Sequence, residues 1–236
     1  MSEDTAGEPV RITGVVNVFG PPVTRESLDK ITKGDKDPQA EFNLMLLEKF
    51  FDLKLPSLSK EMLDRYLECS APELAIPFTP LIERIVPPLK SAKRNYCFGE
   101  YISTIALCGM IGEMLAILLW RATPMTIGGK VMDEREQQDM FGNYTFEDLG
   151  QERRVRVLYT LKAIDDNKKA KFDCLRNCRK KFLHKWDVDL TKEKSEALEC
   201  LKTCYLLFKE IFGLQIINSQ IAVNPLILKV IQDGRA

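Results

Sequence analysis

His184 is the only histidine in this chain of 236 residues, so any chemistry that requires an imidazole must use it. Histidine changes its protonation near neutral pH, which suits it to proton transfer. The surrounding stretch, residues 176–186, contains five cationic side chains and ends in an aromatic one. We therefore take this stretch, and Arg179 with His184 in particular, as the candidate site.

Arg179 is the most unusual residue of this stretch. On a helical wheel of about 100° per residue it falls in the middle of an apolar arc, which consists of Phe172, Leu175, Phe182, Leu183 and Trp186. A buried charge without a partner is too costly to persist. We therefore expect Arg179 to pair either with an internal carboxylate, for which Glu113 is the natural candidate, or with a phosphate bound in a cleft.

Four of the seven cysteines are spaced four apart in two pairs, which places each pair on one face of a helix. A turn at Asp189 would bring Cys178 opposite Cys200, and Cys174 opposite Cys204. Three interpretations follow: small side chains that fill a close helix contact, two interhelical disulfides, or a four-thiolate metal site. We expect the first in a reducing compartment.

These residues belong to a chain whose apolar spacing predicts an all-α bundle. Helices are expected at 98–121, 145–164, 168–186 and 191–212, and the first of these is apolar nearly all round, as in the innermost rod of a bundle. The short connection at 187–190 makes the last two an antiparallel C-terminal hairpin.

The remainder of the chain is divided by glycine and proline. Residues 1–22 are expected to form a tail with one short strand or extended segment at 10–19, which either pairs with a partner chain or stays loose. Residues 23–91 should form short amphipathic helices packed on the bundle, and residues 92–236 the bundle itself. The breaks in the second region are expected at Gly34, Pro38, Pro56, Pro72, Pro87 and Pro88. A loop with one short helix is expected at 123–144, and a last short helix and tail at 218–232.

Composition limits the environment and the partners. The 34 basic and 34 acidic residues cancel, so no global field draws the chain to nucleic acid or to an anionic membrane, and no specific DNA binding is indicated. The acidic, polar N-terminus shows no secretory or transit signal, which predicts a cytoplasmic protein. Residues 101–120 are long enough to span a membrane, but Glu113 near their middle favours burial inside protein. The sequence contains no phosphate-binding loop, and we expect no cofactor.

The Arg-x-x-x-x-His pattern of Arg179 and His184 resembles the signature of the HEPN superfamily, the higher eukaryotes and prokaryotes nucleotide-binding domains. The run Tyr96-x-x-Gly99-x-Tyr101, which continues into Ala106-x-x-Gly109-x-x-x-Glu113, is similar to the long first bundle helix of some members. The resemblance covers roughly residues 92–212. Active members usually have Asn, Asp or His directly after the arginine, whereas this chain has Lys180.

The resemblance implies an RNA-binding homodimer and a metal-independent endoribonuclease, such as a toxin component of a defence or stress system. His184 would then take the proton of the ribose 2′-hydroxyl, and Arg179 would hold the scissile phosphate. The substrate would be bound by their neighbours Arg176, Asn177, Lys180, Lys181 and Lys185, with Glu113 as the supporting carboxylate. Because five residues of straight helix turn by about 140°, the pair requires either a helix that ends near Leu183 or a site shared between subunits.

The alternative is a non-catalytic helical regulator or assembly module that acts through protein–protein contacts, similar to the mannitol operon repressor type of bundle. In that case His184 complements the dipole at the end of its helix, and Lys180, Lys181 and Lys185 form a solvated face. The two hypotheses differ in whether Arg179 and His184 meet at an open basic cleft.

Overall fold

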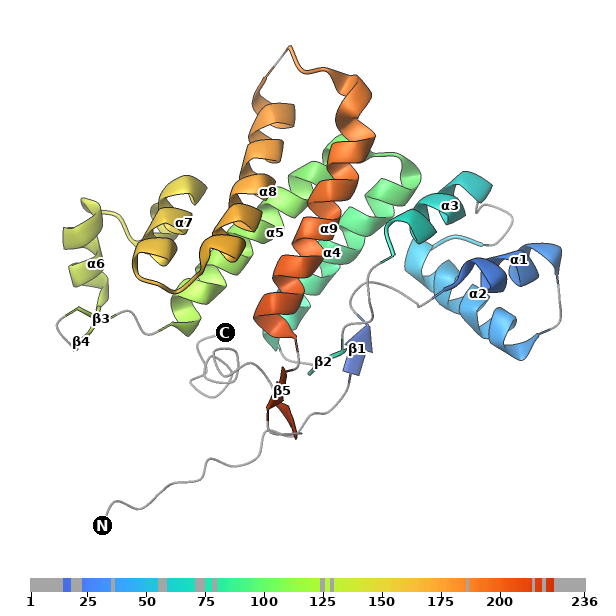
Figure 1. Cartoon of the computed structure of the whole chain (residues 1–236), viewed down its shortest axis with the longest axis horizontal. Coiled ribbons are helices and arrows are strands. Elements are labelled where there is room, and N and C mark those ends of the chain that lie inside the picture. The colour runs from blue at the N-terminus through green and yellow to red at the C-terminus, as the bar shows by residue number, and fades with distance from the viewer. Residues whose placement is uncertain are drawn as a thin grey trace.

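The chain folds as an all-α helical bundle in the computed structural model, which confirms the predicted fold class. The described residues are 15–17, 23–34, 37–54, 59–70, 75–77, 80–123, 126–127, 130–185, 187–213, 215–217 and 220–222. Most of the predicted N-terminal tail and Trp186 lie outside them. Figure 1 shows the long helices side by side, with shorter helices at both ends of the molecule.

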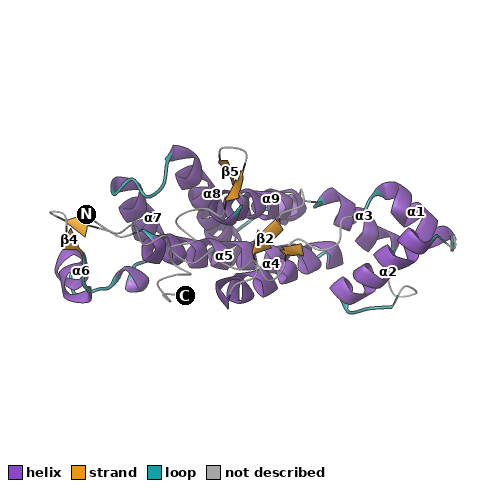
Figure 2. Cartoon of the chain, turned by 90° about the horizontal axis from the view of Figure 1, so that it is seen from below, coloured by secondary structure: helices purple, strands orange, loops and turns teal. Residues whose placement is uncertain are grey.

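Four long helices form the core: α4 (Pro80–Phe98), α5 (Tyr101–Ala122), α8 (Asp166–His184) and α9 (Glu193–Phe212). α5 contacts each of the other three, and α8 and α9 lie over the layer that α4 and α5 form (Figures 1 and 2). α5 is long and apolar enough to cross a membrane, and 56% of its most apolar stretch is buried within the bundle. Its apolar side chains therefore fill the centre of the core, as the sequence predicts.

α8 and α9 form the predicted antiparallel hairpin. α8 begins two residues earlier than predicted, because the Asp165 side chain accepts a hydrogen bond from the Lys168 backbone N–H and caps the helix there. A short 3₁₀ turn, η3 (Leu190–Lys192), leads into α9, with Asp189 accepting from the Thr191 backbone N–H.

The prediction of a helix break at the double proline is wrong. α4 runs through Pro87 and Pro88 without interruption, and the proposed domain boundary at residue 91 falls inside it. Proline removes a backbone hydrogen bond and disfavours a helix interior. Here Leu89 and Tyr96, which are fully buried on this helix, are held in the core by packing, and tertiary packing decides most helix stability.

Three shorter helices lie at one end of the molecule (Figure 2): α1 (Arg25–Lys33), α2 (Pro38–Phe51) and α3 (Lys60–Glu68). α2 joins the bundle through aromatic rings, because Phe51 contacts both Tyr66 of α3 and Phe98 of α4. α2 is amphipathic, as predicted for this region. Phe42 is 52% exposed, and the helix buries Ala40, Asn43, Leu47, Phe50 and Phe51.

The segment between α5 and α8 contains the predicted short helix, α6 (Glu134–Phe141). Two strands of two residues each, β3 (Thr126–Ile127) and β4 (Lys130–Val131), precede it and pair antiparallel. The predicted helix at 145–164 is divided in two. The capping box of Thr145 and Asp148 is present, but it starts a 3₁₀ turn, η2 (Phe146–Asp148), and α7 (Gln151–Thr160) begins only after Gly150.

Two antiparallel strand pairs complete the described structure. β1 (Val15–Asn17) lies within the predicted N-terminal strand, and it pairs with β2 (Ala75–Pro77) of the same chain rather than with a partner. β5 (Gln215–Ile217) pairs with β6 (Gln220–Ala222). The helix predicted at 218–232 is therefore wrong at β6, which is an extended strand paired with β5, and the rest of the prediction lies outside the described residues.

Candidate functional site

A surface pocket of about 370 Å³ lies where the first turn of α7 meets the C-terminal half of α8. We call it the basic pocket, and it is lined by Gly150, Gln151, Glu152, Arg153, Arg176, Arg179, Lys180 and His184. Its lining contains four cations and one carboxylate. Arg179 and His184, the predicted pair, thus border the same space within one chain.

Arg179 packs against Gly109 of α5 on its way to the pocket. A Cβ atom added to Gly109 would lie 2.5 Å from Cδ of Arg179, so the arginine stem rests directly on this glycine. The guanidinium Nη1 then pairs with Oε1 of Glu113. The predicted partner of Arg179 is therefore confirmed, and the arginine is anchored with 33% of its side chain exposed.

Glu113 also faces a second arginine. Nη1 of Arg154, a buried residue of α7, lies 3.7 Å from Oε2 of Glu113. Arg154 further donates to the backbone carbonyls of Phe146 and Glu147. The carboxylate thus stands between two guanidinium groups and ties α5, α7 and α8 together, which fixes the position of Arg179.

His184 is the last residue of α8 and is exposed. The backbone leaves the helical conformation at Lys185, with φ −111° and ψ 132°. The chain therefore ends its helix close to Leu183, which is one of the two conditions that the sequence set for bringing His184 and Arg179 to one site.

The first turn of α7 supplies backbone donors to the same pocket. Its N-cap is Gly150, which has no side chain with which to bind the free N–H groups of that turn. An uncapped helix N-terminus favours an anion, because its N–H groups and the helix dipole point toward it. Two further donors of the lining, Nε2 of Gln151 and Nε of Arg176, are buried and have no hydrogen-bond partner among the described residues.

Carboxylates moderate the positive charge of the basic pocket. Glu152 pairs with Arg176 across the pocket and with Arg156 along α7 at 3.2 Å. Arg176 also pairs with Asp173 at 3.2 Å. Arg153 and Lys180 are both exposed and form no ion pair within the described part of the chain. They are therefore the cations best placed to meet an incoming anion.

The structure separates the residues that the sequence grouped as substrate-binding. Arg176 and Lys180 line the basic pocket, whereas Asn177 and Lys181 line another pocket between α8 and α9. Lys181 is paired with Glu196 of α9, which raises the pKa of its ammonium group. Lys185 is exposed and lines neither pocket. Successive residues on a helix point about 100° apart, so a contiguous run cannot face one site.

Sequence reasoning missed three contributors: Gln151, Arg153 and the buried Arg154. The signal was Gly150, which breaks the helix that was predicted to continue from Thr145. Recognising that glycine as an N-cap would have placed the following residues in a first turn, where anion sites form.

The cysteines confirm one predicted pair and contradict the other. Cys178 and Cys200 face each other across α8 and α9 and line one pocket. Cys174 lies beside Thr203 instead, and Cys204 lies beside Cys108 of α5. Cys204 is rotated by about 40° from Cys200, and this is enough to turn it from α8 toward α5. All seven thiols are free, and the described residues hold no cluster of three or more His, Cys, Asp or Glu suited to a metal, so the four-thiolate site is wrong.

Comparisons with protein-family models, with curated proteins and with solved structures find no match to this chain. The resemblance to HEPN domains therefore rests on the sequence motif alone.

Proposed function

We propose that the chain is an HEPN-like RNA-binding protein that cleaves single-stranded RNA without a metal ion, and that the basic pocket is its active site. One observation carries the proposal: Arg179 and His184 line the same pocket as the uncapped first turn of α7 and the cations Arg153 and Lys180. Each of these groups suits a phosphate diester.

The proposed reaction uses two side chains in distinct roles. His184 takes the proton of a ribose 2′-hydroxyl, whose oxygen then attacks the adjacent phosphorus. The bond from phosphorus to the 5′-oxygen breaks, the 5′-oxygen gains a proton from solvent, and a 2′,3′-cyclic phosphate remains. Arg179 stabilises the developing charge, since its pair with Glu113 engages Nη1 and a guanidinium carries five N–H donors.

Arg153, Lys180 and the α7 N-terminus would bind the flanking phosphates. Binding to a single strand weakens with salt, by a slope of about −0.7 per phosphate contact in a plot of log K against log salt concentration. Contacts from Arg153 and Lys180 alone therefore predict a slope of roughly −1.4. The proposal includes homodimerisation, which the resemblance implies. A sedimentation measurement that shows an active monomer would contradict this part of the proposal.

The test is to incubate the purified chain with labelled RNA in EDTA. Wild type should produce fragments with cyclic phosphate ends, and His184→Ala should lose cleavage but retain binding. A substrate with a 2′-deoxyribose at the scissile position should stay intact. Absence of cleavage by wild type, or equal cleavage by His184→Ala, contradicts the proposal.

Lys185→Ala is the matched control for Lys180→Ala. Both variants lose one positive charge at the end of α8, but only Lys180 lines the basic pocket. Lys180→Ala should reduce the salt slope by about 0.7, whereas Lys185→Ala should leave it unchanged. Equal changes in both variants would indicate general attraction by charge rather than binding in the pocket.

A non-catalytic helical regulator is the second candidate, and the pair of Arg179 with Glu113 favours it, because this pair explains the arginine without any ligand. On that proposal Arg179→Ala and Glu113→Gln should lower stability by similar amounts, and neither should change RNA affinity. On the nuclease proposal Glu113→Gln leaves Arg179 with a full net charge toward the pocket, and RNA binding should become tighter.

A further inference from the structure

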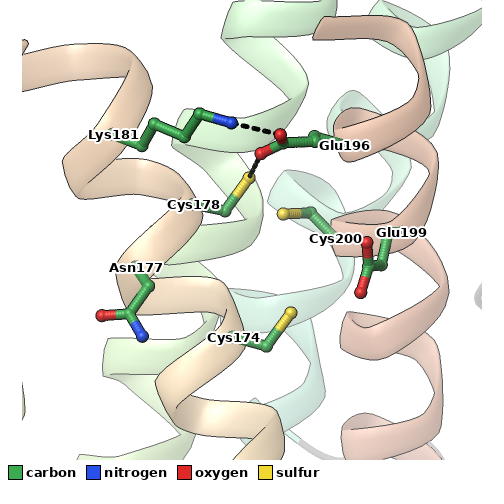
Figure 3. Close-up of a pocket in the computed structure, with 7 residues that line it drawn as sticks. All are labelled: Cys174, Asn177, Cys178, Lys181, Glu196, Glu199 and Cys200. Atoms are coloured by element: carbon green, nitrogen blue, oxygen red, sulfur yellow. Dashed lines mark hydrogen bonds and ion pairs between the residues drawn. The ribbon is translucent and has the colours of Figure 1, made fainter. Parts of the chain in front are cut away.

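The pocket between α8 and α9 contains three thiols that the proposed RNA chemistry does not use. Its volume is about 230 Å³, and its lining is Cys174, Asn177, Cys178, Lys181, Glu196, Glu199 and Cys200. Figure 3 shows the sulfurs of Cys178 and Cys200 directed toward each other across the two helices. We call this space the thiol pocket.

From this arrangement we propose that the thiol pocket is a site of reversible oxidation, in which a hydroperoxide converts Cys178 and Cys200 into an interhelical disulfide. The oxidant is a small hydroperoxide such as hydrogen peroxide, which an open pocket of this size admits. This proposal is independent of the basic pocket, although both sites lie on α8.

A chain of hydrogen bonds prepares Cys178 to react first. Its Sγ donates to Oε2 of Glu196 at 3.6 Å, and the other oxygen of that carboxylate pairs with Lys181 (Figure 3). The contact with Cys178, together with burial, raises the pKa of the Cys200 thiol, so Cys200 stays protonated beside the reacting sulfur. Glu196 is thus positioned to accept the proton that Cys178 must lose before it can attack a peroxide.

The oxidation proceeds in two balanced steps. In the first, Cys178 sulfur attacks one peroxide oxygen, the O–O bond breaks, and the thiol proton passes through Glu196 to the departing hydroxide, which leaves as water. In the second, Cys200 sulfur attacks the sulfenic acid of Cys178, the S–O bond breaks, and a second water leaves. Two thiols thereby give two electrons to one peroxide molecule.

Access distinguishes this pair from the other thiol contacts of the chain. Cys69 lies beside Cys97, and Cys108 lies beside Cys204. All four of these side chains are 0% exposed, whereas Cys178 is 8% exposed and borders an open pocket. Cysteine oxidation depends on exposure as well as on thiolate character. Two neighbouring sulfurs are therefore not enough, and we expect the accessible pair to be oxidised before the two buried pairs.

The experiment treats the reduced full-length chain with limiting hydrogen peroxide, alkylates the remaining thiols after denaturation, and maps disulfide-linked peptides by mass spectrometry. The Cys178–Cys200 linkage should form first, about tenfold faster than any linkage of the two buried pairs. Dithiothreitol should then restore all seven thiols. First formation of another linkage, or a product that dithiothreitol does not reduce, would overturn the proposal.

Cys174→Ser is the matched control for Cys178→Ser, because Cys174 lies one turn away on the same helix and lines the same pocket. Rapid oxidation should persist in Cys174→Ser and disappear in Cys178→Ser. The reverse result would make Cys174 the reactive thiol and refute the assignment. Mapping of the wild-type chain decides the question independently if either variant folds poorly.

Discussion

Gly109→Ala tests the contact that positions Arg179. The new methyl group would lie 2.5 Å from Cδ and 3.0 Å from Cβ of Arg179. Cβ is fixed to the backbone of α8, so the clash cannot be relieved by the flexible end of the side chain alone. Overpacking of this kind costs about 1–3 kcal/mol, while replacing glycine by alanine inside a helix contributes about 1 kcal/mol in the opposite direction. We expect a net loss of roughly 1–2 kcal/mol, since the displaced arginine also loses part of its pair with Glu113.

Gly112→Ala is the control for this substitution. Its methyl group would meet Cδ1 of Leu175 at 3.2 Å and Nε2 of Gln151 at 3.3 Å, both at the ends of flexible side chains, and Cβ of Leu175 at an ordinary contact distance of 3.7 Å. It should leave stability unchanged or increase it by up to about 1 kcal/mol. Urea unfolding of both variants gives the comparison.

A double-mutant cycle isolates the contact. An Arg179→Ala background removes Cγ and Cδ but keeps Cβ, which lies 3.0 Å from the new methyl group. The remaining close contact then offsets the gain from replacing glycine, so Gly109→Ala should be about neutral there. The coupling between the two positions is then about 1–2 kcal/mol. A Gly109→Ala variant as stable as Gly112→Ala, or an effect that is the same in both backgrounds, would refute the reasoning.

Three further predictions concern the helices around the site. Asp165→Ala should lower stability by about 1 kcal/mol through loss of the N-cap. The side-chain hydrogen bond from Lys168 lowers the pKa of Asp165 in the folded state. The stability that Asp165 contributes is therefore complete above its unfolded pKa and is lost as the pH falls through its folded pKa. In urea titrations the stability difference between Asp165→Ala and wild type should be full at pH 7 and shrink below about pH 4. Arg154→Met should cost about 2–4 kcal/mol because it leaves two backbone carbonyls without their donor and Glu113 with one arginine instead of two; a cost under about 0.5 kcal/mol would contradict the buried network. Oxidation of Cys178 and Cys200 should stabilise the chain by about 3 kcal/mol, the value for closing a loop of roughly 20 residues, and an unchanged thermal midpoint after complete oxidation would contradict it.

The helices were predictable because their signals are local. Apolar periodicity located α5, α8 and α9, and the short connection gave their hairpin. Pro87 and Pro88 misled the prediction for the same reason: a local breaker was overruled by side chains of α4 that pack in the core. Gly150 shows the opposite error, since a helix predicted through it ends up divided, with α7 beginning after it.

The candidate site was predictable only in part. The sequence showed that Arg179 needs a partner and named Glu113, because a charge on an apolar arc must be neutralised wherever the helix lies. It did not show that Lys180 and Lys181 face different pockets, or that the first turn of α7 completes the basic pocket. Those facts depend on how each helix is rotated about its axis.

The sequence by itself thus determined the class of fold, the hairpin, the need of Arg179 for a partner and the facing of Cys178 and Cys200, all of which follow from spacing along one or two adjacent helices. Only the tertiary structure decided that Arg179 and His184 share a pocket, that Cys204 turns to Cys108, and that Gly109 holds the arginine stem. The physical reason is that helix rotation is fixed by the simultaneous packing of all the core helices, and no single segment contains that information.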